Sequence, residues 1–145
     1  MKTGDRVIDA STLGTVVFAV SATLGVVGSD PVRLVSAIVA GLLFVVGCGA
    51  FVAGFLAGVG RSRTEDIDMA GLFFLSGTAP RAVRRRLRGL VIVQVAIALT
   101  AAGLRPFTES AFGVLAPMFG LGLMALWGGR NGDFTRPDPA PAPSD

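Results

Sequence analysis

The sequence LVSAIVAGLLFVVGCGAFVAGFLAGVG, residues 34–60, contains no Asp, Glu, Lys, Arg or His in 27 positions. Three further stretches share this property: residues 10–29, 89–104 and 110–129. A helix needs about 17 to 25 apolar residues to cross the hydrocarbon core of a bilayer, whereas soluble helices of this length carry charge on one face. The sequence therefore predicts an all-α integral membrane protein, a bundle of four spanning helices.

The composition leaves room for one membrane domain. Of 145 residues, 52% are hydrophobic and 16% are charged, and the mean hydropathy is +0.68; soluble proteins average about 25% charged residues. We predict a cytoplasmic N-terminus at residues 1–9, a membrane domain at residues 10–129 and a disordered proline-rich tail at residues 130–145. The predicted spans are residues 10–28, 34–60, 87–104 and 110–129, with a cytoplasmic loop at residues 61–86.

The basic residues are distributed unequally between the connections. Eleven of the thirteen lie in the N-terminal segment, in the region between the second and third spans, and in the tail. The other two are Arg33 and Arg105, in the remaining turns. Cytoplasmic connections carry the excess of Lys and Arg, so we expect a multi-pass protein of the plasma membrane with both termini in the cytoplasm.

Four arginines precede the third span with helical spacing. Arg81, Arg84, Arg85 and Arg88 follow the pattern i, i+3, i+4, i+7, which forms one stripe on a helix. Near a membrane surface such a stripe attracts anionic lipid by about 1 kcal/mol per basic residue. Three interpretations remain open: a topology signal with nonspecific lipid attraction, a defined lipid or phosphate site, and a surface for an acidic protein. No aromatic side chains interleave with the arginines, which argues against nucleic acid as a partner.

The loop before this stripe contains a short amphipathic segment. Thr64 is the expected N-cap, and the acids that follow it suit a helix N-terminus. We expect the segment to lie in the membrane interface; the alternative is a buried or re-entrant plug. Its predicted common face consists of Ile67, Gly71, Phe74 and Leu75. The acids Glu65, Asp66 and Asp68 are expected to pair with neighbouring arginines, so we predict no metal site and no cofactor.

Small residues mark a packing face on the second span. Ala50, Gly54 and Gly58 are spaced by four residues, which allows close approach of a second helix. Whether that helix belongs to the same chain or to a second copy is open. Gln94 is the most polar residue deep in a span, and we expect it to form one interhelical hydrogen bond.

Three single residues carry local predictions. Pro117 lies inside the fourth span and predicts a kink, because proline removes a backbone hydrogen bond. Thr78 is the expected N-cap of the helix that contains the third span. Trp127 near the inner end of the fourth span is expected in the aromatic belt at the membrane interface.

The absences argue against several activities. The chain has no histidine, the usual acid-base residue near neutral pH, and the spans contain no base to activate a nucleophile. We therefore predict a protein that is not an enzyme. Small four-helix multidrug exporters are similar in size, but they depend on a glutamate in their first helix, and residues 10–29 contain none.

The chain also resembles small membrane proteins of GC-rich actinobacteria. The resemblance rests on the bias toward Ala, Gly, Val and Arg, on FLSGTAPR at residues 74–81, and on LRPFTESAFGVLAPMFGLG at residues 104–122. It implies a four-helix membrane architecture and brings neither an activity nor a catalytic residue.

These observations predict a non-enzymatic accessory or scaffold protein that contacts anionic membrane lipids or a partner membrane protein. The alternative is a small channel or carrier for an uncharged or lipid-like solute, formed as a homodimer through Ala50, Gly54 and Gly58.

Overall fold

A computed structural model describes residues 3–104, 106 and 109–134. Its elements are α1 (Thr3–Val27), α2 (Asp30–Arg61), α3 (Met69–Phe74), α4 (Arg81–Leu104), the 3₁₀ helix η1 (Glu109–Leu115) and α5 (Pro117–Asn131). Four helical segments are long and apolar enough to cross a membrane: Gly4–Val27, Asp30–Arg61, Arg81–Leu104 and Ala111–Asn131. The predicted all-α chain with four long apolar helices packed together is confirmed. Of the predicted disordered tail, residues 130–145, the first two belong to α5, which ends at Asn131, and Asp133 N–H donates to the Thr78 carbonyl oxygen. Residues 135–145 lie outside the described residues.

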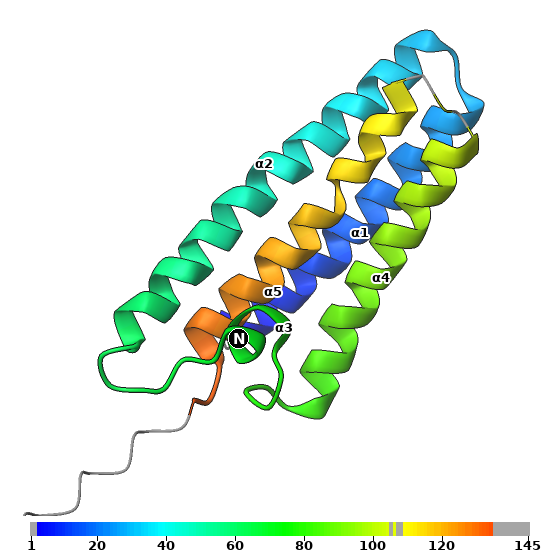
Figure 1. Cartoon of the computed structure of the whole chain (residues 1–145). Helices are drawn as coiled ribbons and strands as arrows, with labels where there is room; N and C mark the ends of the chain where they lie inside the picture. The colour runs from blue at the N-terminus through cyan, green and yellow to red at the C-terminus, as the bar shows by residue number, and fades with distance from the viewer. Residues whose placement is uncertain (1–2, 105, 107–108, 135–145) are drawn as a thin grey trace, which may run out of the picture.

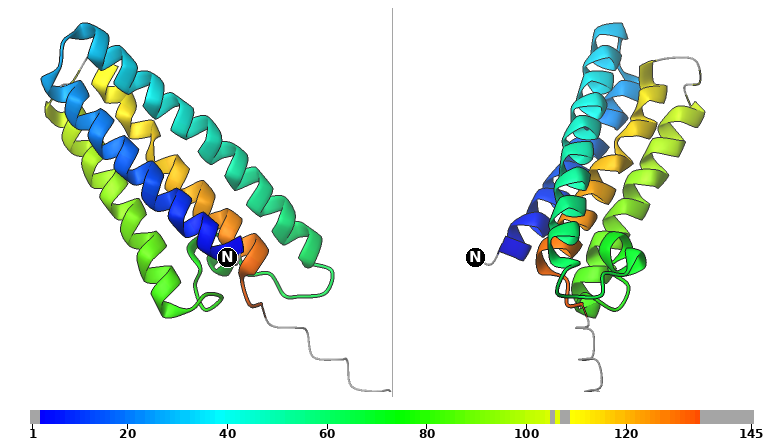
Figure 2. Two further views of the ribbon diagram at one scale, coloured as in Figure 1. Left: turned by 180° about the vertical axis from the view of Figure 1, so that it is seen from behind. Right: turned by 60° about the vertical axis from the view of Figure 1, so that its left-hand side comes forward.

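The helices alternate in direction along the bundle. α1 and α4 run one way, and α2 and η1–α5 run the other, so α2 and α5 are parallel neighbours (Figure 1). We call the end that carries the N-terminus, α3, the start of α4 and the end of α5 the loop end. The views in Figure 2 show that α3 and its flanking segments lie across this end. The described basic residues at the loop end are Arg6, Arg61, Arg63, Arg81, Arg84, Arg85, Arg86, Arg88 and Arg130, and Arg33 lies at the other end.

The helices extend beyond the charge-free stretches. α1 begins at Thr3, well before the expected start near residue 9, because Val7 and Ile8 are buried in the core. α2 begins at Asp30 with Pro31 in its first turn, where proline costs no hydrogen bond. The first turns of α1 and α2 contain the charged residues Asp5 and Asp30, so both helices begin outside the charge-free stretches.

The predicted kink at Pro117 is a change of helix type. η1 ends at Leu115 as a 3₁₀ helix, and α5 begins at Pro117 as an α-helix. The proline lies in the first turn of α5, where its missing N–H would have had no partner within the helix. The fourth span therefore consists of two helical pieces.

The core has two parts with different composition. The cluster near the loop end consists of Val7, Ile8, Leu75, Leu87, Phe119, Leu123, Met124 and Trp127. The second cluster is mostly alanine packed around Phe18. Trp127 is only 6% exposed, so its predicted place in a lipid-facing aromatic belt is wrong. Large side chains such as Leu42, Val45 and Leu56 point outward from α2, as expected for a surface that faces hydrocarbon.

Candidate functional site

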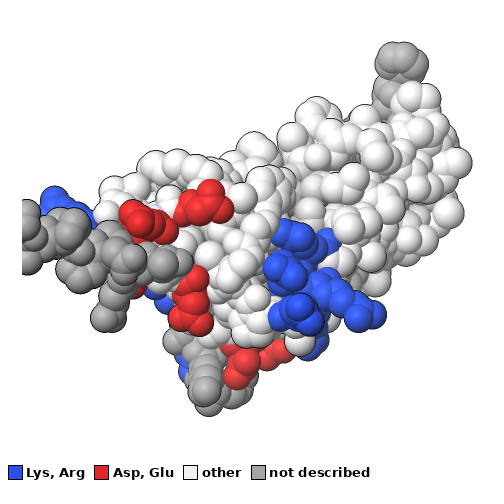
Figure 3. Space-filling view, turned by 60° about the horizontal axis from the view of Figure 1, so that its bottom comes forward, with Lys and Arg blue, Asp and Glu red and all other residues white. Residues whose placement is uncertain are grey.

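The first two turns of α4 present four arginines on one face. Arg81, Arg84, Arg85 and Arg88, which we call the arginine face, line a single surface hollow of about 550 Å³ together with Gly89 and Ile92. A Cβ atom at Gly89 would have no atom within 4 Å, so the glycine leaves this hollow open. Figure 3 shows a patch of Lys and Arg side chains on the loop end, with other Lys and Arg side chains apart from it and Asp and Glu side chains nearby.

The arginine face has no acidic partner among the described residues. The ion pairs within that part of the chain are Arg33 with Asp30, and Arg61 with Glu65. Of the acids expected to neutralise the arginines, Glu65 pairs with Arg61 at 2.6 Å, and Asp68 caps a helix instead. Within residues 3–104, 106 and 109–134, no carboxylate lies within ion-pair distance of the arginine face, which leaves its positive charge uncompensated.

Arg88 differs from the other three because the loop holds it in place. Its Nε donates a hydrogen bond to the carbonyl oxygen of Phe74 at 2.8 Å, and its Nη2 donates to the same oxygen and to Ser76 Oγ, the latter at 2.9 Å. Phe74 is the last residue of α3, so Arg88 satisfies a carbonyl that the helix end leaves without a partner. The Nη1 group has no partner among the described residues and remains available at the edge of the hollow.

The segment before α4 closes the loop end. Leu72 and Leu75 are 1% and 0% exposed, and Leu75, the C-cap residue that follows α3, lies in the left-handed region with φ 56°. The predicted common face is partly wrong, because Phe74 points outward and Leu72 points inward. Leu72 and Leu75 therefore bury the inner side of this segment against the bundle, and its location in the membrane interface stays a prediction.

The hydrogen bonds of this segment also differ from the sequence predictions. The N-cap of α3 is Asp68, whose carboxylate accepts from the Gly71 N–H at 2.8 Å, and not Thr64. Thr78 does not cap α4, because its hydroxyl donates to the Gly71 carbonyl oxygen at 2.8 Å. The Thr78 carbonyl accepts from the Asp133 N–H at 2.9 Å. Hydrogen bonds thus hold the segment together internally and connect it to the residues that follow α5.

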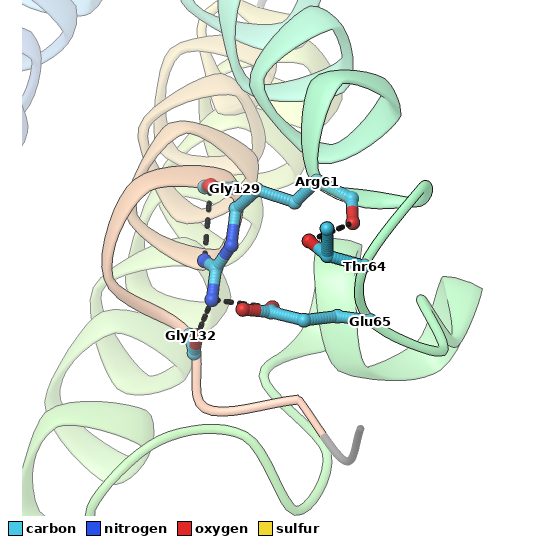
Figure 4. Close-up of polar contacts among 5 residues, drawn as sticks. All are labelled: Arg61, Thr64, Glu65, Gly129 and Gly132. Atoms are coloured by element: carbon cyan, nitrogen blue, oxygen red, sulfur yellow. Dashed lines mark hydrogen bonds and ion pairs between the residues drawn. The ribbon is translucent and has the colours of Figure 1, made fainter. Parts of the chain in front are cut away.

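Arg61 ties the end of α2 to the end of α5 (Figure 4). Its guanidinium donates to the carbonyl oxygens of Gly129 at 3.3 Å and Gly132 at 2.8 Å, pairs with Glu65, and lies 5.2 Å from the centre of the Phe134 ring. From the sequence, Arg61 was one of the basic residues counted for orientation and one of the arginines expected to pair with the acids of the loop, and its bonds to the end of α5 were not predicted. Every helix C-terminus leaves carbonyl groups without partners, and this was the available signal that an arginine near the end of α5 could donate hydrogen bonds there.

The packing face on α2 is occupied within the chain. A Cβ atom at Gly54 would lie 2.5 Å from backbone atoms of Ala125 and Leu126 in α5, and one at Gly58 would lie 3.0 Å from the Leu72 side chain. Ala50 packs against the core beside them. The predicted face therefore meets α5 and α3, and it is not free to form the homodimer considered from the sequence.

Gly122 and Gly129 of α5 and Gly47 of α2 were not identified from the sequence. Gly122 on α5 meets the backbone of Gly47 on α2, and Gly129 meets the backbone of Gly54. The two glycines on each helix are seven residues apart. We call these four residues the glycine seam. Its period of seven keeps the contact on one side of both helices, whereas the spacing of four that we considered identifies only Gly54 of this set.

Gln94 joins α4 to α1 in the interior. It is 1% exposed, and its Nε2 donates to Thr15 Oγ1 at 2.7 Å. The Thr15 hydroxyl donates in turn to the Ser11 carbonyl oxygen at 2.8 Å. Gln94 Oε1 and Ser11 Oγ have no hydrogen-bond partner within the described residues.

No protein-family model, curated protein or solved structure matches this chain. The described residues contain no group of three or more His, Cys, Asp or Glu placed to hold a metal ion. The resemblance to actinobacterial membrane proteins therefore stays a prediction, and function has to be argued from the geometry alone.

Proposed function

We propose that this chain is a non-enzymatic scaffold or accessory protein of the plasma membrane, with both termini in the cytoplasm and its arginine face on anionic lipid. The observation that carries the proposal is the hollow lined by Arg81, Arg84, Arg85 and Arg88, for which the described part of the chain supplies no carboxylate. Uncompensated arginines beside an apolar span attract anionic headgroups.

The proposed orientation follows from the positive-inside rule. Of the basic residues that the structure describes, all except Arg33 belong to helix ends or segments at the loop end. A reporter protein active only in the cytoplasm, fused after residue 145, tests the orientation. Activity is expected, and a reporter active only when exported would reverse the assignment.

Lipid extraction of the purified protein tests the proposed function. We expect anionic phospholipid to be enriched over zwitterionic phospholipid, relative to the membrane of origin, after purification in mild detergent. The triple variant R81Q/R84Q/R85Q should lose this enrichment. R86Q, which removes one charge from the same helix outside the hollow, should keep it. Arg88 is kept because it also fastens the loop.

Two outcomes of that experiment would overturn the proposal. The first is lipid recovered from the native protein in the bulk proportion. The second is an unchanged enrichment in the triple variant, with the C-terminal reporter showing that its topology is preserved. In-membrane crosslinking of the same sample identifies partner proteins, and a scaffold should be captured with at least one other membrane protein.

A second candidate function, a carrier for a small uncharged solute, is favoured by the polar group in the interior. Gln94 Oε1 and Ser11 Oγ are buried without partners in the described structure, and unpaired polar groups in a bundle interior mark candidate solute contacts. Vesicles that contain the protein should then show solute flux that Q94L abolishes. Equal flux through native protein and Q94L vesicles would remove this candidate.

A further inference from the structure

A second hollow adjoins the arginine face on the side of the membrane span. It has a volume of about 460 Å³ and lies between α4 and α5. It shares Arg88 and Ile92 with the hollow of the arginine face. Its other walls are Phe74, Ser76, Val91, Leu121 and Met124. The two hollows therefore adjoin at Arg88 and Ile92, with charge on one side of Arg88 and apolar side chains on the other.

We infer that the two hollows together form a binding site for one anionic phospholipid. The phosphate lies on the arginine face, and one acyl chain lies in the groove between α4 and α5. The inference rests on the proposed function and goes beyond it, because it names a single bound molecule and the two parts of the protein that hold it.

The chemistry of the walls identifies the ligand. Guanidinium groups match the oxygens of a phosphate through paired hydrogen bonds. The guanidinium groups of Arg81, Arg84 and Arg85 have no hydrogen-bond or ion-pair partner among the described residues. The groove residues Val91 and Ile92 belong to a stretch without charge. A ligand that fills both hollows thus has an anionic group next to an apolar chain, which an anionic phospholipid has and free phosphate lacks.

Arg88 sets the junction between the two parts. Its Nε and Nη2 are committed to the Phe74 carbonyl and to Ser76, while Nη1 has no partner in the described part of the chain. The guanidinium is therefore already ordered before a ligand binds, which reduces the entropy lost on binding. Ser76 and Phe74 line the groove themselves, so the loop forms part of the site.

Arg86 provides the matched control for the charged part. It lies on the same turn of α4 and lines a neighbouring hollow, which shares Arg85 and Gly89 with the hollow of the arginine face. Arg86 itself does not line the hollow of the arginine face. A diffuse attraction between a basic surface and anionic lipid would depend on Arg86 as much as on Arg84. A defined site depends on Arg84 and Arg85, and on the fork shape of their guanidinium groups as well as their charge.

A tryptophan reporter tests the inference in the intact protein. I92W places an indole at the groove, and L99W places one on the same face of α4, seven residues further into the span. The two native side chains are 67% and 64% exposed, so both variants should fold. The native tryptophan, Trp127, is buried and supplies a constant background.

The proteins are reconstituted into vesicles of phosphatidylglycerol and phosphatidylcholine in equal amounts, with bromine on the acyl chains of one lipid or the other. Brominated chains quench the indole they touch. For I92W we expect quenching to favour phosphatidylglycerol by at least about fivefold, the factor that corresponds to one arginine near the surface. For L99W we expect no preference. R84K/R85K in the I92W protein should abolish the preference, and R86K should leave it.

Three other outcomes are informative. Absence of a preference at both reporters would overturn the inference and the proposed lipid contact together. An equal preference at both reporters, or an equal loss with R86K and with R84K/R85K, would overturn the site and leave the proposed function standing. A preference for I92W that survives R84K/R85K would show that the arginine fork does not hold the phosphate, and would also overturn the inference.

Discussion

Substitution of Gly54 by alanine tests the glycine seam directly. The new Cβ would lie 2.5 Å from backbone atoms of Ala125 and Leu126, and ordinary contact begins at 3.4 Å, so the two helices must separate locally by about 3.4 − 2.5 = 0.9 Å. The obstructing atoms are backbone, which cannot rotate aside. Gly49, in the same helix, is the matched control because its Cβ would have no atom within 4 Å.

The expected change in the free energy of unfolding follows from two opposing effects. Replacement of glycine by alanine in a helix stabilises by about 0.5 to 1 kcal/mol, and this gain applies to both variants. Overpacking of a tight contact costs about 1 to 3 kcal/mol, and this cost applies only to G54A. We therefore expect G49A to be as stable as the native protein or more so, and G54A to be less stable than G49A by about 1 to 3 kcal/mol.

The assay is equilibrium unfolding in mixed micelles, by titration of a denaturing detergent into a mild one. Helix content is followed by circular dichroism, and the surroundings of Trp127 are followed by its fluorescence, since this side chain is buried on α5. Equal free energies of unfolding for G49A and G54A would refute the seam, because the two substitutions differ only in what the added methyl group meets.

Three further predictions use the same unfolding assay or hydrogen exchange. T15V should destabilise by about 1 kcal/mol, more than Q94L, because it leaves the Gln94 amide without its acceptor; additive effects in the double variant would contradict this. R61A should speed hydrogen exchange at residues 129–134, because two carbonyl acceptors lose their donor, and unchanged exchange would mean that Arg61 does not fasten α5. L75A should cost about 2 to 5 kcal/mol as a core truncation, and a cost below about 1 kcal/mol would show that Leu75 does not pack in the core.

The number of helices and their approximate extent could be predicted because charge is so costly in hydrocarbon. The stretch at residues 34–60 locates α2 to within a few residues at each end. The errors occur where helices leave the membrane. α1 begins at Thr3 because Val7 and Ile8 pack into the core, and that burial depends on which helices are neighbours.

The contacts between helices were harder to predict, for a related reason. With 20 glycines in the chain, small-residue spacing suggests many faces, and only the three-dimensional register selects Gly47 and Gly122 as partners. The roles of Arg61 and Arg88 depend on the positions of particular carbonyl oxygens at the ends of α5 and α3. A count of basic residues contains no information about those positions.

The glycine seam has a consequence for the synthesis of the chain. Gly47 and Gly54 meet residues that follow them by 122 − 47 = 75 and 129 − 54 = 75 positions. At about 5 to 20 residues per second this interval is roughly 4 to 15 s. During that time α2 is complete while the backbone surface meant for α5 faces lipid. A ribosome stalled before residue 117 would release a chain with α2 still open along this surface, and quality-control proteases of the membrane would encounter that form first.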